Sequence, residues 1–277
     1  MKNFTQAPLP FQGQKRRWSK DFKIALKQFE DCSVFIDLFG GSGLLSHYVK
    51  CERPDADVIY NDYDNYADRL ANIPQTNILL TDIRTILKDY PSGKLIAQDI
   101  RVLILDRIKQ EEIKGGYVDY VTLSSSLLFS AKYVTDFDML TKESLYNNTK
   151  QSDYNANGYL DGIKVVKQDY RELFNFWRWH PSACFLVDPP YLSTDSTTYH
   201  NYWRLGSYLD VLQTVKDTNY FYFTSSKSQI LELCEWIEAN LDAVNPFSGA
   251  QKREIHVSLN HTSRYTDIML YKRRYNG

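Results

Sequence analysis

The chain has 277 residues, and its 33 Lys and Arg nearly balance its 34 Asp and Glu. Its 43% hydrophobic and 24% charged residues are typical of a globular chain that is long enough for a sizeable core. This composition excludes a disordered acidic chain and provides no global basic field for nucleic acid. No apolar run approaches the roughly 20 residues that a membrane span requires.

Cysteine and histidine usage predicts a cytoplasmic protein without a metal centre. The four cysteines are scattered and form no C-x-x-C pair, so neither disulfides nor zinc are expected. The five histidines show no metal-ligand spacing such as H-E-x-x-H. The first 20 residues lack the apolar core of a secretory signal. We therefore expect a protein of the reducing cytoplasm, with no metal and no membrane partner.

Strands and helices alternate near the start of the chain. An apolar run at 34–39 predicts a buried strand that ends in glycines, and a helix is predicted after it at 44–50. A second short strand is predicted at 58–60, followed by a helix over 64–72 with Asp64 as its cap. This rhythm is typical of an α/β sheet.

Residues 73–162 interrupt the α/β rhythm. Apolar spacing predicts three helices, separated by a Pro-Ser-Gly break and a Gly-Gly break, over 78–90, 95–113 and 117–129. A polar, turn-rich stretch follows over 136–162. We therefore predict that this whole block is an inserted, mostly helical cap.

The α/β rhythm resumes after the cap. The expected elements are a strand at 163–167, a helix at 171–178, a strand at 183–187, a helix at 205–216, a strand at 220–224, a helix at 228–241 and strands at 254–260 and 263–271. The last two strands are separated by a tight connection and predict an antiparallel edge hairpin. The sequence thus predicts a doubly wound, mainly parallel α/β sheet in one catalytic domain, residues 1–72 and 163–277.

A glycine turn follows the first predicted strand. The strand leads into Asp37-Leu38-Phe39-Gly40-Gly41-Ser42-Gly43, and a helix comes next. Glycines there let the backbone bend sharply and bring a ligand close to main-chain N–H groups at a helix N-terminus. Position 46 is Ser, so the G-x-G-x-x-G fingerprint of dinucleotide-binding proteins is incomplete. By itself, such a turn also suits a purely structural role.

Asp62 lies at the end of the second predicted strand. An acid at the carboxyl edge of a sheet, beside a glycine turn, is placed to accept hydrogen bonds from a ribose diol. A helix N-cap or a turn aspartate is the alternative role. Taken together, Asp62 and the glycine turn favour a nucleoside-binding site.

The run Asp188-Pro189-Pro190-Tyr191 follows the strand predicted at 183–187. Two prolines fix the backbone and lack N–H donors, so the carbonyl groups there are rigid. A carboxylate and a rigid carbonyl can accept both hydrogens of an amino group, which leaves the nitrogen lone pair directed at an electrophile. Tyr191 can stack on a planar ring. A Pro-rich turn is the alternative, but this run at a strand end is the most specific signal in the chain.

These motifs, in this order, resemble the D12-class, Dam-like DNA adenine-N6 methyltransferases. The matching segments are Pro10-Phe11-Gln12-Gly13-Gln14-Lys15, the glycine turn at 37–43, Asn61-Asp62, Gln168-Asp169-Tyr170 and the run at 188–191. The family keeps its target-recognition domain where the predicted cap falls. Two features depart from the family pattern, because Phe11 to Lys15 replaces Trp-Ala-Gly-Gly-Lys and Asp37 stands where Glu or Asp-Pro is common.

The resemblance implies a role for each matching residue. The cofactor, S-adenosylmethionine, would be bound by Phe11, Lys15, Asp37, Phe39, Gly40, Gly41, Ser42, Gly43, Asp62, Asp169 and Asp188. In that set Asp62 would hold the ribose and Asp169 would face the adenine ring of the cofactor. The catalytic residues would be Asp188, Pro189, Pro190 and Tyr191, with the Pro189 carbonyl as second acceptor for the target adenine.

The implied fold is the Rossmann-like fold of S-adenosylmethionine-dependent methyltransferases with an inserted cap. The implied reaction is methyl transfer to N6 of an adenine flipped out of duplex DNA, achieved mostly by positioning and electrostatics. The expected partner is double-stranded DNA. We expect a solitary methyltransferase, monomeric or weakly dimeric.

Local charge identifies segments for DNA contact. Residues 14–27 have a net charge of +5 and residues 252–274 a net charge of +4, so either can contact phosphates, although a solvated surface is the simpler role. The cap has 10 basic and 12 acidic residues, so its Asn- and Tyr-rich stretch at 146–159 is a candidate base reader or a surface loop. The segment 193–204 is a candidate lid over the flipped base.

Four other functions were weighed against DNA adenine methylation. RNA adenine methylation is the close alternative, although many enzymes of that class carry Asn in place of Asp188. Cytosine-N4 methylation is less favoured, because enzymes of that class commonly have Ser at that position. A catalytically silent DNA-binding module on the same fold is disfavoured, because the run at 188–191 is intact. An NAD-dependent enzyme is disfavoured by Ser46 in place of the third glycine.

Overall fold

A seven-stranded sheet forms the centre of the computed structural model, which describes residues 2–129, 132–192, 203–241, 243–258 and 264–274. In spatial order the strands are β3 (Lys164–Val166), β2 (Asp57–Asn61), β1 (Val34–Asp37), β4 (Ala183–Val187), β5 (Asn219–Ser225), β7 (Arg264–Lys272) and β6 (Gln251–Ser258). The first five are parallel, and β7 runs antiparallel to both of its neighbours. The predicted doubly wound sheet with a C-terminal hairpin is confirmed.

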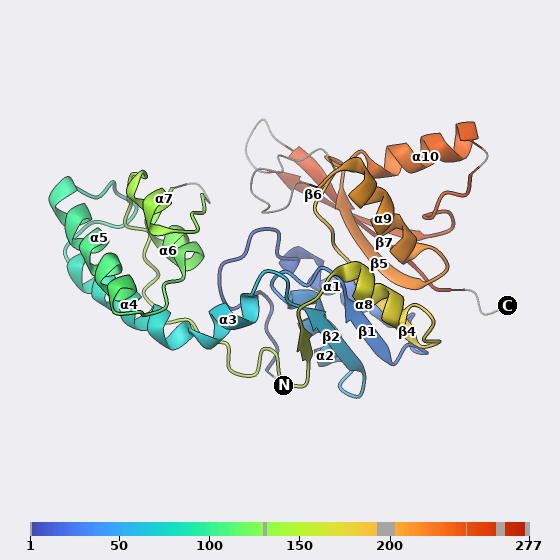
Figure 1. Ribbon diagram of the computed structural model, residues 1–277, viewed down its shortest axis with the longest axis horizontal. Helices are drawn as coiled ribbons and strands as arrows, with labels where there is room; N and C mark the ends of the chain where they lie inside the picture. Colours follow the sequence, from blue (N-terminus) through green and yellow to red (C-terminus); the bar gives the residue numbers. More distant parts are fainter. Residues whose placement is uncertain (1, 130–131, 193–202, 242, 259–263, 275–277) are drawn as a thin grey trace.

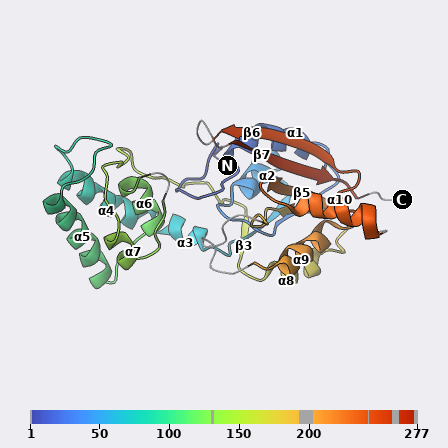
Figure 2. The ribbon, with the colours of Figure 1, turned by 90° about the horizontal axis from the view of Figure 1, so that it is seen from above.

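Helices cover both faces of the sheet (Figure 2). On one face lie α1 (Ser19–Leu26) and α2 (Leu44–Glu52), and on the other α8 (Tyr170–Trp177), α9 (Leu205–Val215) and α10 (Ile230–Leu241). Successive strand residues point to opposite faces, so Phe35 packs in the first core and Ile36 in the second. The sequence analysis did not predict α1 or the short 3₁₀ turn η1 (Arg16–Trp18) before it.

The cap is a separate helical lobe with its own hydrophobic core (Figure 1). Its helices are α4 (Ile73–Ile86), α5 (Gln98–Ile113), α6 (Tyr120–Leu127) and α7 (Phe137–Thr141). Ile83, Ile104 and Leu123 are fully buried in that core. This lobe lies within residues 73–162, and the division of the chain into an inserted cap domain and a catalytic domain stays a prediction. Helix α7 lies in the stretch 136–162, which was predicted to be polar and turn-rich.

A short helix, α3 (Tyr66–Ala71), leads from the sheet into the cap. The expectation that Asp64 caps it is wrong, because the main-chain N–H groups of Tyr66 and Ala67 donate to the Asp62 carboxylate at 2.6 and 2.8 Å. Helix α4 starts earlier than predicted because Pro74 lies in its first turn, where the missing N–H costs no helical hydrogen bond.

The longest helix of the described residues is α5, whose 16 residues span about 24 Å. Within the described part of the chain, no helix combines the length and the apolar character that crossing a membrane would demand. All four cysteines are free thiols.

Candidate functional site

A narrow cleft lies where the direction of strand order reverses, between β1 and β4. Chain segments leaving these two strands diverge to opposite sides, which opens a crevice at their carboxyl ends. The cleft has a free volume of about 20 Å³ and is lined by Phe11, Gly13, Gln14, Lys15, Phe39, Gly40, Gly41, Ser42, Leu44, Leu45 and Asp188. It therefore joins the N-terminal segment, the glycine turn and the residue after β4.

The glycine turn rests on the buried ring of Tyr60. A Cβ atom at Gly40 would lie 2.2 Å from the Tyr60 ring, so only glycine fits there. Gly41 and Gly43 have φ angles of 50° and 70°, in the left-handed region that favours glycine. The Tyr60 hydroxyl lies 2.7 Å from the Gly41 carbonyl oxygen and 3.0 Å from Asp62 Oδ1. The Tyr60 side chain, from the neighbouring strand β2, thus supports the glycine turn.

Asp188 forms an ion pair with Lys15 across the cleft. Lys15 Nζ lies 2.5 Å from Asp188 Oδ2, and it also donates to the Gly13 carbonyl at 3.0 Å. Burial raises the pKa of Asp188, an effect that the Lys15 ammonium partly offsets. Burial lowers the pKa of Lys15, but the nearby Asp188 carboxylate raises it by more. The pKa of Lys15 therefore lies above its ordinary value. The Asp188 carboxylate is therefore paired with the Lys15 ammonium group.

Asp37 is a buried acid at the end of β1, directly before the glycine turn. It is 1% exposed, and its Oδ2 accepts a 2.8 Å hydrogen bond from the Ser46 hydroxyl. Its Oδ1 is one of four buried side-chain atoms in the described residues that lack a hydrogen-bond partner. Burial raises the pKa of Asp37 to about 7, although Ser46 and Lys15 both act to lower it. A buried, unsatisfied carboxylate oxygen is costly unless a ligand or a proton satisfies it.

An aromatic cluster flanks the cleft beside Phe39. The Tyr170 ring centroid lies 4.8 Å from that of Phe39, and Trp203 lies 5.8 Å from Phe39 and 6.0 Å from Tyr170. Tyr208 extends the cluster and donates a 3.2 Å hydrogen bond to the Tyr191 carbonyl. Planar rings at such spacing form a surface on which a further ring can stack. The sequence analysis missed this use of Trp203 and Tyr208.

The structure brings most of the predicted site residues together. Phe11, Lys15, Phe39, Gly40, Gly41, Ser42 and Asp188 all line the cleft. Gly43 and Asp37 lie behind this lining, against Tyr60 and Ser46. Pro189 is buried and Pro190 half-buried. Tyr191 is half-buried, with its ring centroid 5.9 Å from Lys15 Nζ. These residues lie around one cleft at the carboxyl edge of the sheet, and their roles in binding and catalysis stay predictions.

Asp62 and Asp169 have other partners and do not line the cleft. Asp62 caps α3 with both carboxylate oxygens, which is the alternative role that its position allowed. Asp169 caps α8 and accepts from the Arg171 guanidinium at 2.9 Å. The Arg171 hydrogen bond lowers the pKa of Asp169, despite some burial. The roles of Asp62 on a ribose and of Asp169 on an adenine remain predictions.

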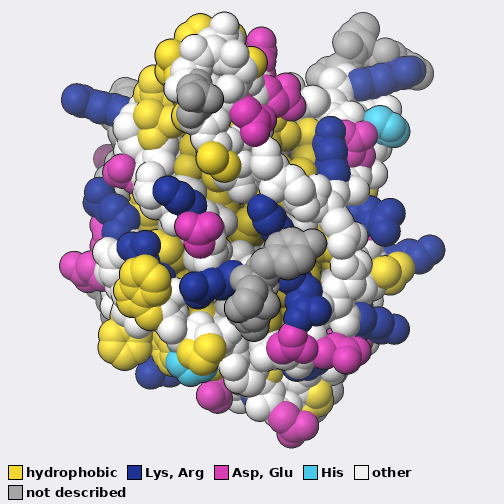
Figure 3. Space-filling view, turned by 90° about the vertical axis from the view of Figure 1, so that its right-hand side faces the viewer, with side chains coloured by type: hydrophobic (Ala, Val, Ile, Leu, Met, Phe, Trp, Pro, Cys, Tyr) yellow, Lys and Arg dark blue, Asp and Glu magenta, His cyan; other side chains and the backbone are white. Residues whose placement is uncertain are grey.

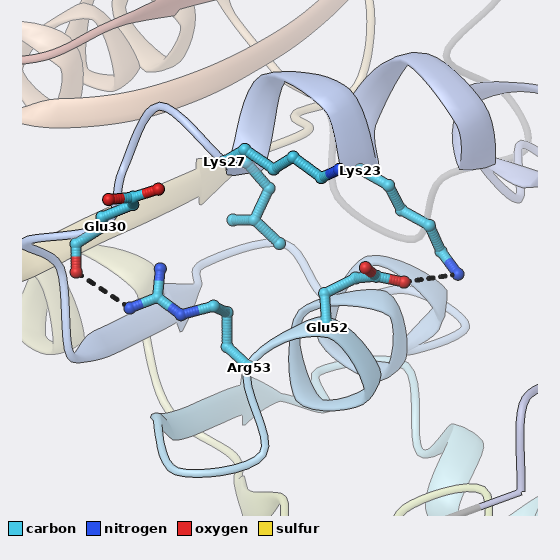
Figure 4. A pocket seen from close by; sticks show the side chains of 6 residues that line it. Lys23, Lys27, Glu30, Glu52 and Arg53 are labelled. Atoms are coloured by element: carbon cyan, nitrogen blue, oxygen red, sulfur yellow. Dashed lines mark hydrogen bonds and ion pairs between the residues drawn. The ribbon is translucent and has the colours of Figure 1, made fainter.

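A second hollow lies between α1 and the end of α2 (Figure 4). It is lined by Lys23, Leu26, Lys27, Glu30, Glu52 and Arg53. Lys23 Nζ lies 2.9 Å from Glu52 Oε1, and Arg53 donates to the Glu30 carbonyl at 3.0 Å. Charges of both signs therefore meet here. The first predicted basic segment is thus divided, because Lys15 lines the cleft while Lys23 and Lys27 line this hollow.

The second predicted basic segment is spread along the C-terminal hairpin. Lys272 donates to the Ser248 carbonyl at 2.6 Å, and Arg273 pairs with Asp31. Arg264 lies at the other end of β7, about 27 Å away for nine extended residues. Figure 3 shows Lys and Arg side chains interspersed with acidic ones on the face that it views. The segment is therefore not one continuous phosphate-binding patch.

Two side chains of the predicted base reader at 146–159 form hydrogen bonds within the cap. The Asn147 side chain donates to the Tyr90 carbonyl at 2.8 Å, and the Asn148 side chain donates to the Leu128 carbonyl at 3.0 Å. These amides therefore already have backbone partners. Most of the predicted lid at 193–204 lies outside the described residues. No group of three potential metal ligands occurs among the residues that the structure describes.

No protein-family model matches the chain. A protein of Haemophilus influenzae named "Putative methyltransferase" is 35% identical to it over 280 aligned residues. The alignment covers 98% of this chain and 93% of that protein. The likeness therefore includes the cap as well as the sheet.

Replacing Gly40 with Ala tests the contact between the glycine turn and Tyr60. The new methyl group would displace the ring, so we expect the free energy of unfolding to fall by about 1–3 kcal/mol in chemical denaturation. Gly206→Ala in α9 is the matched control, because no atom lies within 4 Å of its added Cβ. Equal stabilities of the two variants would contradict the contact.

Replacing Asp37 with Asn tests the raised pKa. Folded Asp37 keeps its proton up to about pH 7, whereas the unfolded chain loses it near 3.8. Between these values the folded state binds more protons, so a rising pH destabilises the wild type. Relative to Asp37→Asn, the wild-type free energy of unfolding should fall from about pH 4 to pH 7 and then level off. Denaturant titrations at several pH values measure this, and a constant difference would refute it.

Proposed function

The chain belongs to the same methyltransferase family as this Haemophilus influenzae protein, and we propose that it methylates N6 of adenine in DNA, with S-adenosylmethionine as the methyl donor. The observation that carries the proposal is the Lys15 ammonium on Asp188, 2.5 Å from its carboxylate. A carboxylate that already binds an amine nitrogen inside the cleft is suited to bind the amino group of an adenine. The rigid Pro189 carbonyl beside it is a second acceptor.

The cleft has the features that a cationic nucleoside cofactor needs. Gly40 and Gly41 line the cleft, where the glycine turn leads into the N-terminus of α2, a kind of place that often binds ligands through main-chain N–H groups. The unpaired Oδ1 of Asp37 is an acceptor for a positively charged amino group. Phe39 and the adjoining rings suit an adenine. S-Adenosylmethionine supplies, when bound, a methyl group on a positively charged sulfur.

The residues of the chain would act mainly by position. The lone pair of an adenine amino group is delocalised into the ring, which makes the nitrogen a poor nucleophile. Hydrogen bonds from N6 to Asp188 and to the Pro189 carbonyl would favour a pyramidal nitrogen directed at the methyl group. The adenine must leave the duplex to reach this cleft, and stacking on Tyr191 would offset part of the unstacking cost.

A cationic cluster beside the cleft supports a nucleic acid as the substrate. Lys227, in the turn after β5, places Nζ 4.5 Å from the ring centroid of Tyr265. The Tyr265 hydroxyl is hydrogen-bonded to Arg17, and both basic residues are exposed. The charges of Lys15, Arg17 and Lys227 all act on Asp267, in the adjacent strand. The sequence analysis did not identify Lys227, because it lies outside both basic segments.

A methyl-transfer assay tests the proposal. With labelled S-adenosylmethionine, unmethylated duplex DNA should gain N6-methyladenine and RNA should gain no label, as identified after digestion to nucleosides. Asp188→Asn places an amide donor where N6 needs an acceptor, so we expect kcat to fall by about 10²–10³-fold. Asp106→Asn, an exposed acid on α5 in the cap, is the control and should retain activity.

Other outcomes of that assay would overturn parts of the proposal. Label in RNA alone would make the chain an RNA methyltransferase. N4-methylcytosine would change the target base. Binding of S-adenosylhomocysteine without transfer to any nucleic acid would indicate a silent module, and full activity of Asp188→Asn would remove Asp188 from the chemistry.

The double variant Arg17→Gln/Lys227→Gln tests whether the cationic cluster contacts phosphates. Each lost phosphate contact should lower the slope of log affinity against log salt by about 0.9, so a total change of about 1–2 is expected. Fluorescence anisotropy with a labelled duplex at several salt concentrations measures it. Arg253→Gln, an exposed cation on β6, is the control. The same slope for the double variant and the wild type would contradict this contact.

A further inference from the structure

A buried ion pair connects the cap to the helix that leads into it. Arg69 of α3 and Asp119, the N-cap of α6, approach to 3.1 Å, and their side chains are 11% and 2% exposed. Asp119 also accepts from the main-chain N–H of Thr122 at 3.0 Å and from its hydroxyl at 2.7 Å. The cap therefore holds Arg69 through a fully engaged carboxylate. Removal of either residue would leave the charge of the other buried and unpaired, which strongly destabilises a protein.

The same arginine binds the N-terminal segment. Arg69 Nη2 donates to the Pro10 carbonyl at 2.9 Å. One helical turn earlier, the Tyr66 hydroxyl accepts from the Leu9 N–H at 2.9 Å and donates to the Leu9 carbonyl at 3.0 Å. Arg69 also lies over the Tyr66 ring, at 5.2 Å. Three hydrogen bonds thus fix two consecutive residues of the N-terminal segment to α3.

The residue after this anchored pair forms a wall of the cleft. Phe11 packs edge-on against Tyr66, with ring centroids 5.6 Å apart. Its Cε1 lies 3.0 Å from the point where a Cβ of Gly41 would be, so the ring touches the glycine turn. Pro10 has a fixed φ angle, which leaves little freedom between the anchored carbonyl and the ring. The position of Phe11 therefore depends on the position of the Pro10 carbonyl.

We infer that Arg69 is a positioning residue through which the cap stabilises the cofactor cleft. Asp119 orients the guanidinium, the guanidinium holds the Pro10 carbonyl, and the carbonyl sets the Phe11 ring against the glycine turn. The lobe assigned to target recognition thus contributes to cofactor affinity without touching the cofactor. This inference rests on the proposed function, because it takes S-adenosylmethionine as the ligand of the cleft.

Titration calorimetry with S-adenosylhomocysteine tests the inference. Asp119→Asn removes the charge but keeps an oxygen for the α6 cap, since Asn is a good N-cap residue. We expect this variant to raise the dissociation constant about tenfold. Asp153→Asn breaks the Arg84–Asp153 ion pair, which has no contact with the N-terminal segment, and should leave the constant unchanged.

A double-mutant cycle with Phe11→Ala separates positioning from general destabilisation. If the effect of Asp119 passes through Phe11, Asp119→Asn should weaken binding much less in the Phe11→Ala background than in the wild type. A merely structural defect would weaken binding equally in both backgrounds. Should Asp119→Asn fold poorly, Arg69→Met/Asp119→Leu removes both charges together and should weaken binding to the same extent.

The possible failures are distinguishable. Wild-type protein that binds S-adenosylhomocysteine, with Asp119→Asn within twofold of it, would overturn the inference and leave the proposed function intact. An equal effect of Asp119→Asn in both backgrounds would also overturn it. Absence of binding to the wild type would overturn the proposed function, and the inference with it.

Discussion

The parallel pairing of β1 with β4 is the constraint on which the cleft depends. Val34 lies opposite Ala183 and Asp37 opposite Leu186, so the two strands end at one edge of the sheet. Every residue of both strands is buried, which leaves their register little freedom. Because β1 runs into the glycine turn and β4 into Asp188, this pairing brings together two segments about 150 positions apart in the chain.

Buried tyrosines hold the main chain around the cleft. Tyr60, Tyr66 and Tyr159 are each at most 1% exposed, and each hydroxyl bonds to a main-chain carbonyl of the N-terminal segment or the glycine turn. A buried phenol needs such a partner, so each tyrosine both fills the core and fixes a carbonyl. Tyr60 and Tyr159 thus support the glycine turn, and Tyr66 supports the N-terminal segment.

The charges of the cleft suit the chemistry proposed for it. Two acids, the buried Asp37 and the half-buried Asp188, lie near one half-buried base, Lys15. Above about pH 7, where Asp37 loses its proton, this arrangement has a negative balance that a cationic cofactor would neutralise. Lys15 binds Oδ2 of Asp188, and an incoming adenine amino group would donate to the same carboxylate. Because that amino group is neutral, Lys15 must stay nearby as the counter-charge of Asp188.

Local patterns in the sequence determined the sheet, the glycine turn and the run at 188–191. Short apolar runs, turn residues and fixed proline geometry act within a few residues, so each predicted strand of the sheet is present in the structure. Helix α1 was missed because its charged residues mask the buried face formed by Phe22, Ala25 and Leu26.

Only the tertiary structure decided which groups meet across long separations. The sequence placed Asp62 correctly at a strand end, but the start of α3 four residues later made it a helix cap. Arg69 and Asp119 are 50 positions apart, and nothing local marks them as partners. Such pairs form because burial of a charge requires a counter-charge, and which one is within reach depends on how the cap packs against α3.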